Sequence, residues 1–117
     1  MQDHRRQPTH PVRVRRAQRA LLDGQATSLA EQVRTVVCEP TRTQIVRALS
    51  AGPLPVGDLA LAVERSRTIV SKHLRVLREE AVVLASRRGR NVYYALTEEP
   101  VTRASILALK AVAEAAV

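Results

Sequence analysis

Large aromatic side chains and cysteine are nearly absent from this sequence. Its 117 residues include no Phe or Trp, two Tyr and one Cys. The single cysteine, Cys38, can form neither an intramolecular disulfide nor a paired-cysteine metal site. Leu, Val, Ile and Ala must therefore fill the core, and a core built from them in a chain of this length is small. We expect one domain that buries further apolar surface against a partner.

Long apolar runs are absent as well. No window approaches 18 consecutive apolar residues, so the sequence predicts no transmembrane helix. The N-terminal segment is rich in arginine and lacks the apolar stretch of a secretory signal. The C-terminal segment is apolar, but its only basic residues are Arg103 and Lys110, too few for a strong interfacial anchor. These features predict a cytoplasmic protein without a membrane partner.

Acidic residues are few relative to basic ones. The chain has 19 Lys and Arg against 11 Asp and Glu, a net charge of +8, and a pI near 11.2. This excess favours a polyanionic partner such as nucleic acid. Residues 1–20 carry most of it, with six Arg against one Asp. Because they also contain two Pro and little apolar surface, we expect residues 1–20 to form a flexible basic arm, helical at most from about Arg15, before a folded domain at 21–117.

Apolar residues at helical spacing predict four short helices at the start of the folded domain. The first should span Ser28–Val37, with Ser28 and Glu31 forming a capping box. The fourth should begin at Arg67, after an N-cap at Ser66, and end near Glu80. Between them lie a helix from Thr41 to the Ala51-Gly52-Pro53 stop and a short helix that opens at Pro55-Val56-Gly57-Asp58.

The residue pattern changes after the fourth helix. β-branched and aromatic residues at 82–86 and 91–96 predict a β-hairpin with Arg87-Arg88-Gly89-Arg90 at its tip. A last helix should run from about Glu98 to Val117, with Thr97 or Glu98 as its N-cap. The first and last helices present more apolar surface than a small monomer can cover, which predicts a homodimer. The residues expected at its interface are Leu29, Val33, Val36, Ile106, Leu109 and Val112.

The helix at 67–80 has two faces of different chemistry. Val70, Leu74 and Leu77 point toward the core. The opposite face carries hydrogen-bond donors of the kinds that contact base edges and phosphates: Arg67, Thr68, Ser71, Lys72 and Arg75. Taken alone, this face favours a merely solvated helix surface. A short helix and tight turn before it, and a basic hairpin after it, favour a mostly α winged helix-turn-helix that reads double-stranded DNA.

Four segments, in this order, resemble motifs of the ArsR/SmtB family of bacterial repressors. They read EPTRTQIVRAL at 39–49, VGDLA at 56–60, SRTIVSKHLRVLR at 66–78 and SRRGRNVYYAL at 86–96. The resemblance covers roughly residues 28–97. It implies a dimeric winged-helix repressor that binds a palindromic operator and is released by a metal ion or another small signal. Glu64 and Ala81 depart from the pattern, since the family has glycine there, and Arg65 replaces an apolar residue.

The resemblance also implies where a metal ion could bind. One family site uses a Cys-x-Cys pair on the second or third helix, and this chain has one cysteine. Another uses Asp, His and Glu ligands on the last helix, where residues 98–117 hold only Glu98, Glu99 and Glu114. A redox site of two cysteines in one chain fails for the same reason. The sequence therefore predicts no metal ion at these sites and no cofactor, and it does not identify an effector.

One cysteine and three histidines remain to be assigned. Cys38 follows an apolar stripe and is expected to be a small buried core residue. His73, on the predicted recognition helix, is expected to pack or to contact a backbone phosphate. His4 and His10 lie in the arm and are expected to be solvated. A metal site formed by an arm histidine and Cys38 from two protomers stays open as an alternative.

These observations predict a sequence-specific DNA-binding transcriptional regulator, a repressor that acts as a homodimer on a palindromic operator. The alternative is a basic nucleoid-associated or RNA-binding protein that binds mainly without sequence preference. An ordered face of donors argues against the alternative, because such a protein needs charge alone. No spacing suggests a nucleophile–base pair or paired carboxylates, so an enzyme is not expected. Further DNA contacts are predicted from the hairpin (Arg87, Arg88, Arg90) and from the arm (Arg13, Arg15, Arg16, Arg19).

Overall fold

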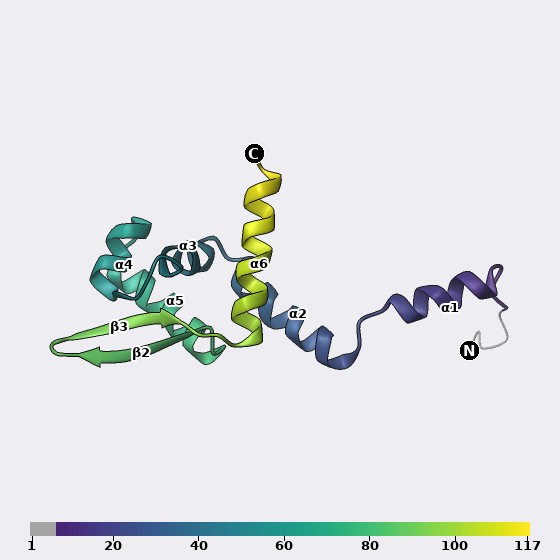
Figure 1. Cartoon of the computed structure of the whole chain (residues 1–117), viewed down its shortest axis with the longest axis horizontal. Coiled ribbons are helices and arrows are strands. Elements are labelled where there is room, and N and C mark those ends of the chain that lie inside the picture. Colours follow the sequence, from purple (N-terminus) through teal and green to yellow (C-terminus); the bar gives the residue numbers. More distant parts are fainter. Residues whose placement is uncertain (1–6) are drawn as a thin grey trace.

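The structure is a computed structural model that describes residues 7–117; His4 lies outside this range. Three of its helices pack against a small antiparallel sheet, and the first helix lies at the far end of the molecule (Figure 1). The elements, in chain order, are α1 (Pro11–Ala20), α2 (Gly24–Val37), α3 (Pro40–Leu49), β1 (Leu54–Pro55), α4 (Val56–Val63), α5 (Arg67–Glu79), β2 (Val83–Arg88), β3 (Asn91–Leu96) and α6 (Pro100–Ala115). The predicted mostly α fold with a hairpin is confirmed.

The core lies where α3, α4 and α5 meet the sheet. Its buried apolar side chains are all aliphatic, and among them Ile45, Leu59, Leu74 and Leu77 are fully buried. Tyr94 packs against its edge. Leu74 and Leu77 are two of the three α5 positions that the helical spacing assigned to the interior. The core therefore fixes α5 against two other helices and the hairpin.

Helix α2 begins earlier than predicted. Asp23, not Ser28, is its N-cap, and the Asp23 carboxylate accepts a hydrogen bond of 2.7 Å from the Ala26 N–H. Ser28 thus lies inside the helix, and Glu31 pairs with Arg34 at 2.8 Å rather than closing a capping box. The predicted box was wrong because Asp23 offers a cap farther upstream, which accommodates another turn of helix.

The N-cap of α6 also differs from the prediction. Glu99 occupies that position without a side-chain capping bond, and Pro100 starts the helix. Thr97 instead ties the chain to the end of the sheet region: its hydroxyl donates to the Ala81 carbonyl at 2.7 Å and lies 2.6 Å from the Thr102 hydroxyl. The result is a well-anchored start of α6, which crosses α2 in Figure 1.

The sheet has three strands in the order β1-β3-β2. Strand β2 pairs with β3 from Val83↔Leu96 to Arg88↔Asn91, so Arg87 and Arg88 belong to the strand and the turn is only Gly89-Arg90. The predicted four-residue tip was therefore too long. The third strand, β1, was not predicted, because two residues are too few for a periodic pattern.

Helix α1 stands apart from the rest of the molecule. It begins at Pro11 rather than near Arg15, and none of its residues is buried. Figure 1 shows it at the opposite end of the molecule from the hairpin. The radius of gyration, 19.6 Å, exceeds the about 13 Å of a compact chain of this length. Proline at the first helical position accounts for the earlier start, because its fixed φ suits that position.

Two turns place a non-glycine residue in the left-handed region. Glu64 (φ 56°) ends α4, and Ala81 (φ 62°) follows α5. Both are positions where the family pattern has glycine. A residue with a Cβ in this conformation costs about 1–2 kcal/mol. The turn between α4 and α5 therefore keeps the shape that glycine would allow, at some expense in stability.

Helix α6 carries one buried polar group with an unusual environment. Within residues 7–117, the Ser105 hydroxyl is the buried side-chain atom that has no hydrogen-bond partner. By contrast, the buried Thr102 hydroxyl contacts both Thr97 and the Val82 carbonyl.

No helix in the described part of the chain is long and apolar enough to cross a membrane.

The lone hydroxyl of Ser105 leads to a stability prediction. Ser105→Ala should raise the free energy of unfolding by about 1 kcal/mol, because an unsatisfied buried hydroxyl is removed at almost constant volume. Thr102→Val is the matched control and should lower the free energy by a similar amount, since its hydroxyl is bonded. Urea unfolding followed by circular dichroism measures both, and a destabilised Ser105→Ala would contradict the prediction.

Candidate nucleic-acid interface

Helix α5 is held by its buried side and leaves its other side free. Ser66 is its N-cap, and the Ser66 hydroxyl accepts a hydrogen bond of 3.2 Å from the Ile69 N–H. Val70, Leu74 and Leu77 are buried against the neighbouring elements. The turn at Glu64 and Arg65 sets α5 at its angle to α4. Both the N-cap and the buried face agree with the sequence prediction.

The five predicted donors of α5 all lie on its exposed side: Arg67, Thr68, Ser71, Lys72 and Arg75. They follow one face of the helix, and the free N–H groups of its first turn add a site for phosphate at the same end. Ser71 and Arg75 also line a hollow of about 410 Å³ between α5 and Tyr94 of β3. The arrangement presents a polar, positively charged ridge with the dimensions of one helix, which fits a DNA major groove.

Arg67 packs against the helix that precedes α5. Its guanidinium lies against the backbone of Gly57 in the first turn of α4, where a Cβ would sit 2.3 Å from the nearer nitrogen. Only glycine leaves this space. The Arg67 side chain is therefore folded back along α4.

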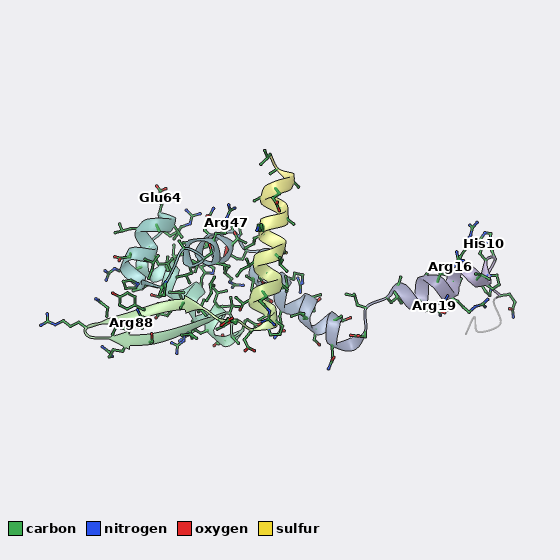
Figure 2. All side chains as sticks on the ribbon, viewed as in Figure 1. His10, Arg16, Arg19, Arg47, Glu64 and Arg88 are labelled. Carbon is green, nitrogen blue, oxygen red and sulfur yellow. The ribbon has the colours of Figure 1, made fainter. Side chains whose placement is uncertain are left out.

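The hairpin carries its three arginines at the end farthest from the core. Arg87, Arg88 and Arg90 are all exposed. The Arg88 guanidinium lies 5.0 Å from the centre of the Tyr93 ring, a cation–π contact on the outer face of the sheet. Figure 2 shows Arg88 near the tip of the hairpin, while Arg16 and Arg19 lie on α1 at the other end of the molecule.

A polar cluster links α3 to α5. Arg42 Nε donates to His73 Nδ1 at 3.2 Å, and another Arg42 nitrogen donates to the Thr35 carbonyl of α2 at 2.9 Å. The Glu39 carboxylate lies 3.3 Å from His73 Nδ1. His73 is thus packed against the N-terminus of α3. Packing was one of the two roles predicted for it, and contact with a phosphate was the other. The role of Arg42 in this cluster was not predicted from the sequence, since helical spacing does not reveal contacts between distant segments.

Glu39 is both the N-cap of α3 and a member of this cluster. Its carboxylate accepts hydrogen bonds from the N–H groups of Thr41 and Arg42, each at 3.1 Å. Partial burial raises its pKa, but these two bonds and the nearby His73 and Arg42 together lower that pKa below the ordinary value of 4.5. The folded state therefore favours the ionised carboxylate.

This shift predicts how stability depends on pH. Because folding lowers the pKa of Glu39, its contribution is complete above about pH 4.5 and is lost as the pH falls through the folded-state pKa. Glu39→Gln should lower the free energy of unfolding by about 1 kcal/mol at neutral pH and weaken its decline in acid. Glu114→Gln, at an exposed site on α6, is the control. Identical acid profiles for Glu39→Gln and the parent would contradict the prediction.

The other candidate ligands do not gather. Cys38 is exposed at the C-cap of α2, so its predicted place in the core was wrong: the chain turns toward α3 there, and Val37 is the last residue of the stripe to pack inward. His10 is an exposed residue at the start of α1. Within residues 7–117, no three His, Cys, Asp or Glu side chains lie close enough to hold a metal ion.

The predicted dimer residues divide into three groups. Val36 is fully buried within the single chain and cannot contribute to an interface, because its position on α2 faces the core. Leu29, Val33, Ile106 and Leu109 are half-buried against the same core. Val112 is exposed, as are three apolar residues that the sequence prediction omitted: Leu21, Leu22 and Leu107.

Comparison with known proteins identifies the family of this chain. Residues 39–83 match the model for bacterial regulatory proteins of the arsR family. The transcriptional regulator NmtR of Mycobacterium tuberculosis is 37% identical over 94 residues, 80% of this chain and 78% of NmtR. The repressor SmtB homolog of Synechocystis is 38% identical, over 79% of this chain and 70% of that protein.

Solved structures agree with these relatives. The antimony-specific repressor AntR superposes with a TM-score of 0.68 at 30% identity, covering 81% of this chain and 86% of AntR. The homodimeric winged helix-turn-helix domain of Mb0332 from Mycobacterium bovis gives 0.63 at 30% identity, covering 81% and 90%. With its winged helix-turn-helix and exposed donor face, this chain belongs to the ArsR family of bacterial transcriptional regulators.

Proposed function

We propose that this protein is a repressor that acts as a homodimer on a palindromic operator. The observation that carries the proposal is the exposed row of donors on α5, at the free side of a helix whose other side is locked into the core. The SmtB homolog and AntR, which are similar to this chain, are both named as repressors. A repressor needs a rigid reading helix, and this packing supplies one.

Each part of the interface has a distinct role in this proposal. Arg67, Thr68, Ser71 and Lys72 enter the major groove, where Arg can bind guanine with two hydrogen bonds and Ser and Thr can bind several edges. Arg75 lies farther along α5 beside the hairpin and contacts phosphate. The hairpin arginines contact the phosphates or the minor groove that flank each half-site. Phosphate contacts position the protein, while the groove contacts select the sequence.

The dimer is proposed to form through α2 and α6. Leu107, on α6, is 67% exposed in the single chain, and Leu21, in the linker just before α2, is 74% exposed. A second copy would cover them and leave two α5 helices about 34 Å apart, one turn of DNA. Mb0332, a structural neighbour, is a homodimer. Figure 1 shows α1 beyond the start of α2, away from the α5 of its own chain.

The effector of the proposed repressor is not a metal ion held at the two family sites described above. One needs paired cysteines, and the chain has only Cys38. The other needs Asp and His on the last helix, and residues 98–117 contain neither. Release from DNA would therefore use a different site.

One experiment tests the proposal as a whole. The full-length protein is used to select binding sequences from a pool of random duplexes, and its mass is measured by sedimentation. We expect a two-fold symmetric consensus and a dimer at micromolar concentration. Selection of no consensus would instead favour a nucleoid-associated or RNA-binding protein, the less favoured alternative, and a monomer whose mass is unaffected by removal of residues 101–117 would contradict the proposed interface.

The hairpin gives a prediction about salt dependence. Replacing Arg87, Arg88 and Arg90 by glutamine should reduce the slope of log affinity against log salt by about 0.9 for each phosphate that a protomer no longer neutralises. Fluorescence anisotropy on the selected operator, at a series of salt concentrations, measures the slope. Arg103→Gln, an exposed arginine on α6, is the control. An unchanged slope for the triple variant would show that the hairpin arginines do not contact DNA phosphates.

A further inference from the structure

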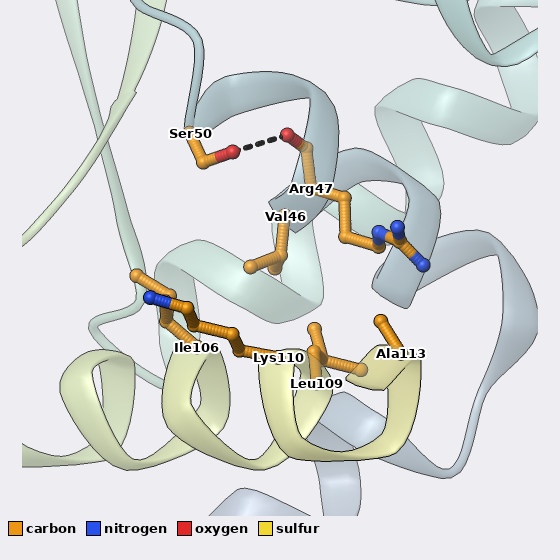
Figure 3. Close-up of a pocket in the computed structure, with 7 residues that line it drawn as sticks. All are labelled: Val46, Arg47, Ser50, Ile106, Leu109, Lys110 and Ala113. Carbon is orange, nitrogen blue, oxygen red and sulfur yellow. Dashed lines mark hydrogen bonds between the residues drawn. The ribbon is translucent and has the colours of Figure 1, made fainter. Parts of the chain in front are cut away.

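A hollow between α3 and α6 has the chemistry of a small-molecule site. Its volume is about 340 Å³, within the range of ligand pockets, about 300–1,000 Å³. Val46, Ile106, Leu109 and Ala113 form its apolar wall. Figure 3 shows these side chains facing one another across the space between the two helices. An apolar ligand body could replace water here with a gain in free energy.

Two cations border the hollow, and neither pairs with an acidic side chain in the described part of the chain. Arg47 extends from α3 above Ala113, and Lys110 runs along α6 past Ile106, so they lie at different ends of the apolar wall (Figure 3). Among residues 7–117, the short contacts between acidic and basic side chains are Glu31 with Arg34 and Glu39 with His73, and neither involves Arg47 or Lys110. Two such cations beside a concave apolar surface favour an anionic ligand over a neutral one.

A second hollow adjoins the first. Its volume is about 370 Å³, and it shares Arg47, Leu109 and Ala113 with the first while extending along α6 to Val112. The Arg47 side chain thus stands over a longer apolar trough. A carboxylate bound by the guanidinium would have room for an apolar body on either side.

Both hollows lie on the side of α6 opposite Leu107, through which the dimer is proposed to form, so Ile106, Leu109 and Val112 are assigned here to the hollows rather than to the interface that the sequence predicted for them. At 100° per residue, Leu109 and Ala113 lie on one side of the helix, and the exposed Leu107 and Ala111 lie on the other. The partner subunit would cover the side with Leu107. The mouth of the hollow therefore stays open to solvent in that arrangement.

The position of the hollow connects it to the DNA-binding surface. Helix α3 contacts α5 through Arg42 and His73. Helix α6 crosses α2, the other helix of the proposed interface. A ligand wedged between α3 and α6 would therefore change how α5 is held relative to the dimer axis. Binding in the hollow and binding to DNA would then alter each other's affinity by the same factor.

We propose that the hollow between α3 and α6 binds a small carboxylate with an apolar body, and that this ligand changes the affinity for the operator. The effect on operator affinity rests on the proposed function, whereas binding of the carboxylate does not. Arg47 is assigned as the main carboxylate partner, because its planar donors match a carboxylate, and Lys110 as a weaker second partner.

Octanoate is a suitable probe, and its binding to the DNA-free protein is measured by calorimetry and by NMR shifts of the methyl groups of Val46, Ile106 and Leu109. We expect octanoate to bind, with acetate and 1-octanol each at least about tenfold weaker, since one lacks the body and the other the charge. Arg47→Gln should weaken octanoate about tenfold and Lys110→Gln by less. Arg34→Gln, at an exposed site on α2, is the control.

Three outcomes would overturn the inference. Absence of methyl shifts at millimolar octanoate would exclude the site. Equal affinity for 1-octanol, or indifference to Arg47→Gln, would exclude recognition of the carboxylate. Octanoate that binds but leaves operator affinity unchanged, in a protein that otherwise binds the operator, would exclude the regulatory role. Failure to bind any operator without octanoate would instead count against the proposed function.

Discussion

Replacing Arg67 by alanine should weaken binding of the dimer to its selected operator by about 2–6 kcal/mol, because each of two half-sites forfeits a base interaction worth about 1–3 kcal/mol. The loss should be sequence-dependent, with relaxed preference at one base position in each half-site. Binding to a panel of operators that differ at single positions, measured by anisotropy, checks both points. Equal weakening on every duplex would make Arg67 a phosphate contact only.

The packing of Arg67 against Gly57 suggests a second variant, which tests the position from which Arg67 acts. Gly57→Ala keeps the arginine but places a methyl group where its guanidinium now lies. If Arg67 swings outward to read a base, Gly57→Ala should leave operator affinity unchanged or raise it slightly, because the competing position on α4 is removed. A fall in affinity comparable to that of Arg67→Ala would show that the arginine acts from its folded-back position.

Deletion of residues 1–20 should have the other large effect. It removes a net charge of +5 from each protomer, as six Arg and one Asp are deleted. We expect affinity for the operator and for random duplexes to fall together, and the association rate to fall as well, since the arm attracts phosphate without reading bases. Undiminished binding of both duplexes at low salt would show that the arm does not contact DNA.

A finer version of this experiment keeps the chain length. Replacing Arg13, Arg15, Arg16 and Arg19 by glutamine should make the salt slope shallower by up to about 7, as eight arginines per dimer each release about 0.9 counterion. Replacing the same four by lysine is the control and should keep most of the affinity. A lysine variant as weak as the glutamine variant would mean that the guanidinium shape, as in minor-groove insertion, matters more than charge.

Local patterns predicted most of the fold, because they depend on residues close in sequence. The two faces of α5 and its Ser66 N-cap follow from helical spacing and a single hydroxyl. The start of α2 was misplaced because the prediction placed the cap at Ser28, directly before the apolar stripe, whereas the cap is Asp23. The spacing of the stripe does not show how far the helix extends upstream of it, since Asp23 can satisfy the first N–H groups of a longer helix.

The candidate interface was predicted less completely than the fold. Exposure of the α5 donors and the hairpin arginines could be inferred from their opposition to buried positions. The packing of Arg67 on Gly57, the link from Arg42 to His73 and the hollow beside Arg47 all join segments distant in sequence. Such contacts depend on how helices cross, which no periodicity encodes. The fully buried state of Val36 was missed for the same reason.

The isolation of α1 has a thermodynamic consequence. This helix has ten residues, no side-chain N-cap and no acidic residue in its first turn, and isolated helices below about 12–15 residues are marginal in water. Its four arginines repel one another, and phosphates would neutralise them if the arm contacts DNA as proposed. Its helix–coil equilibrium would then shift toward helix on DNA, and part of the electrostatic gain would be offset by the entropy of ordering the backbone. The arm would then bind DNA more weakly than its charge alone suggests, and its net contribution would shrink as temperature rises.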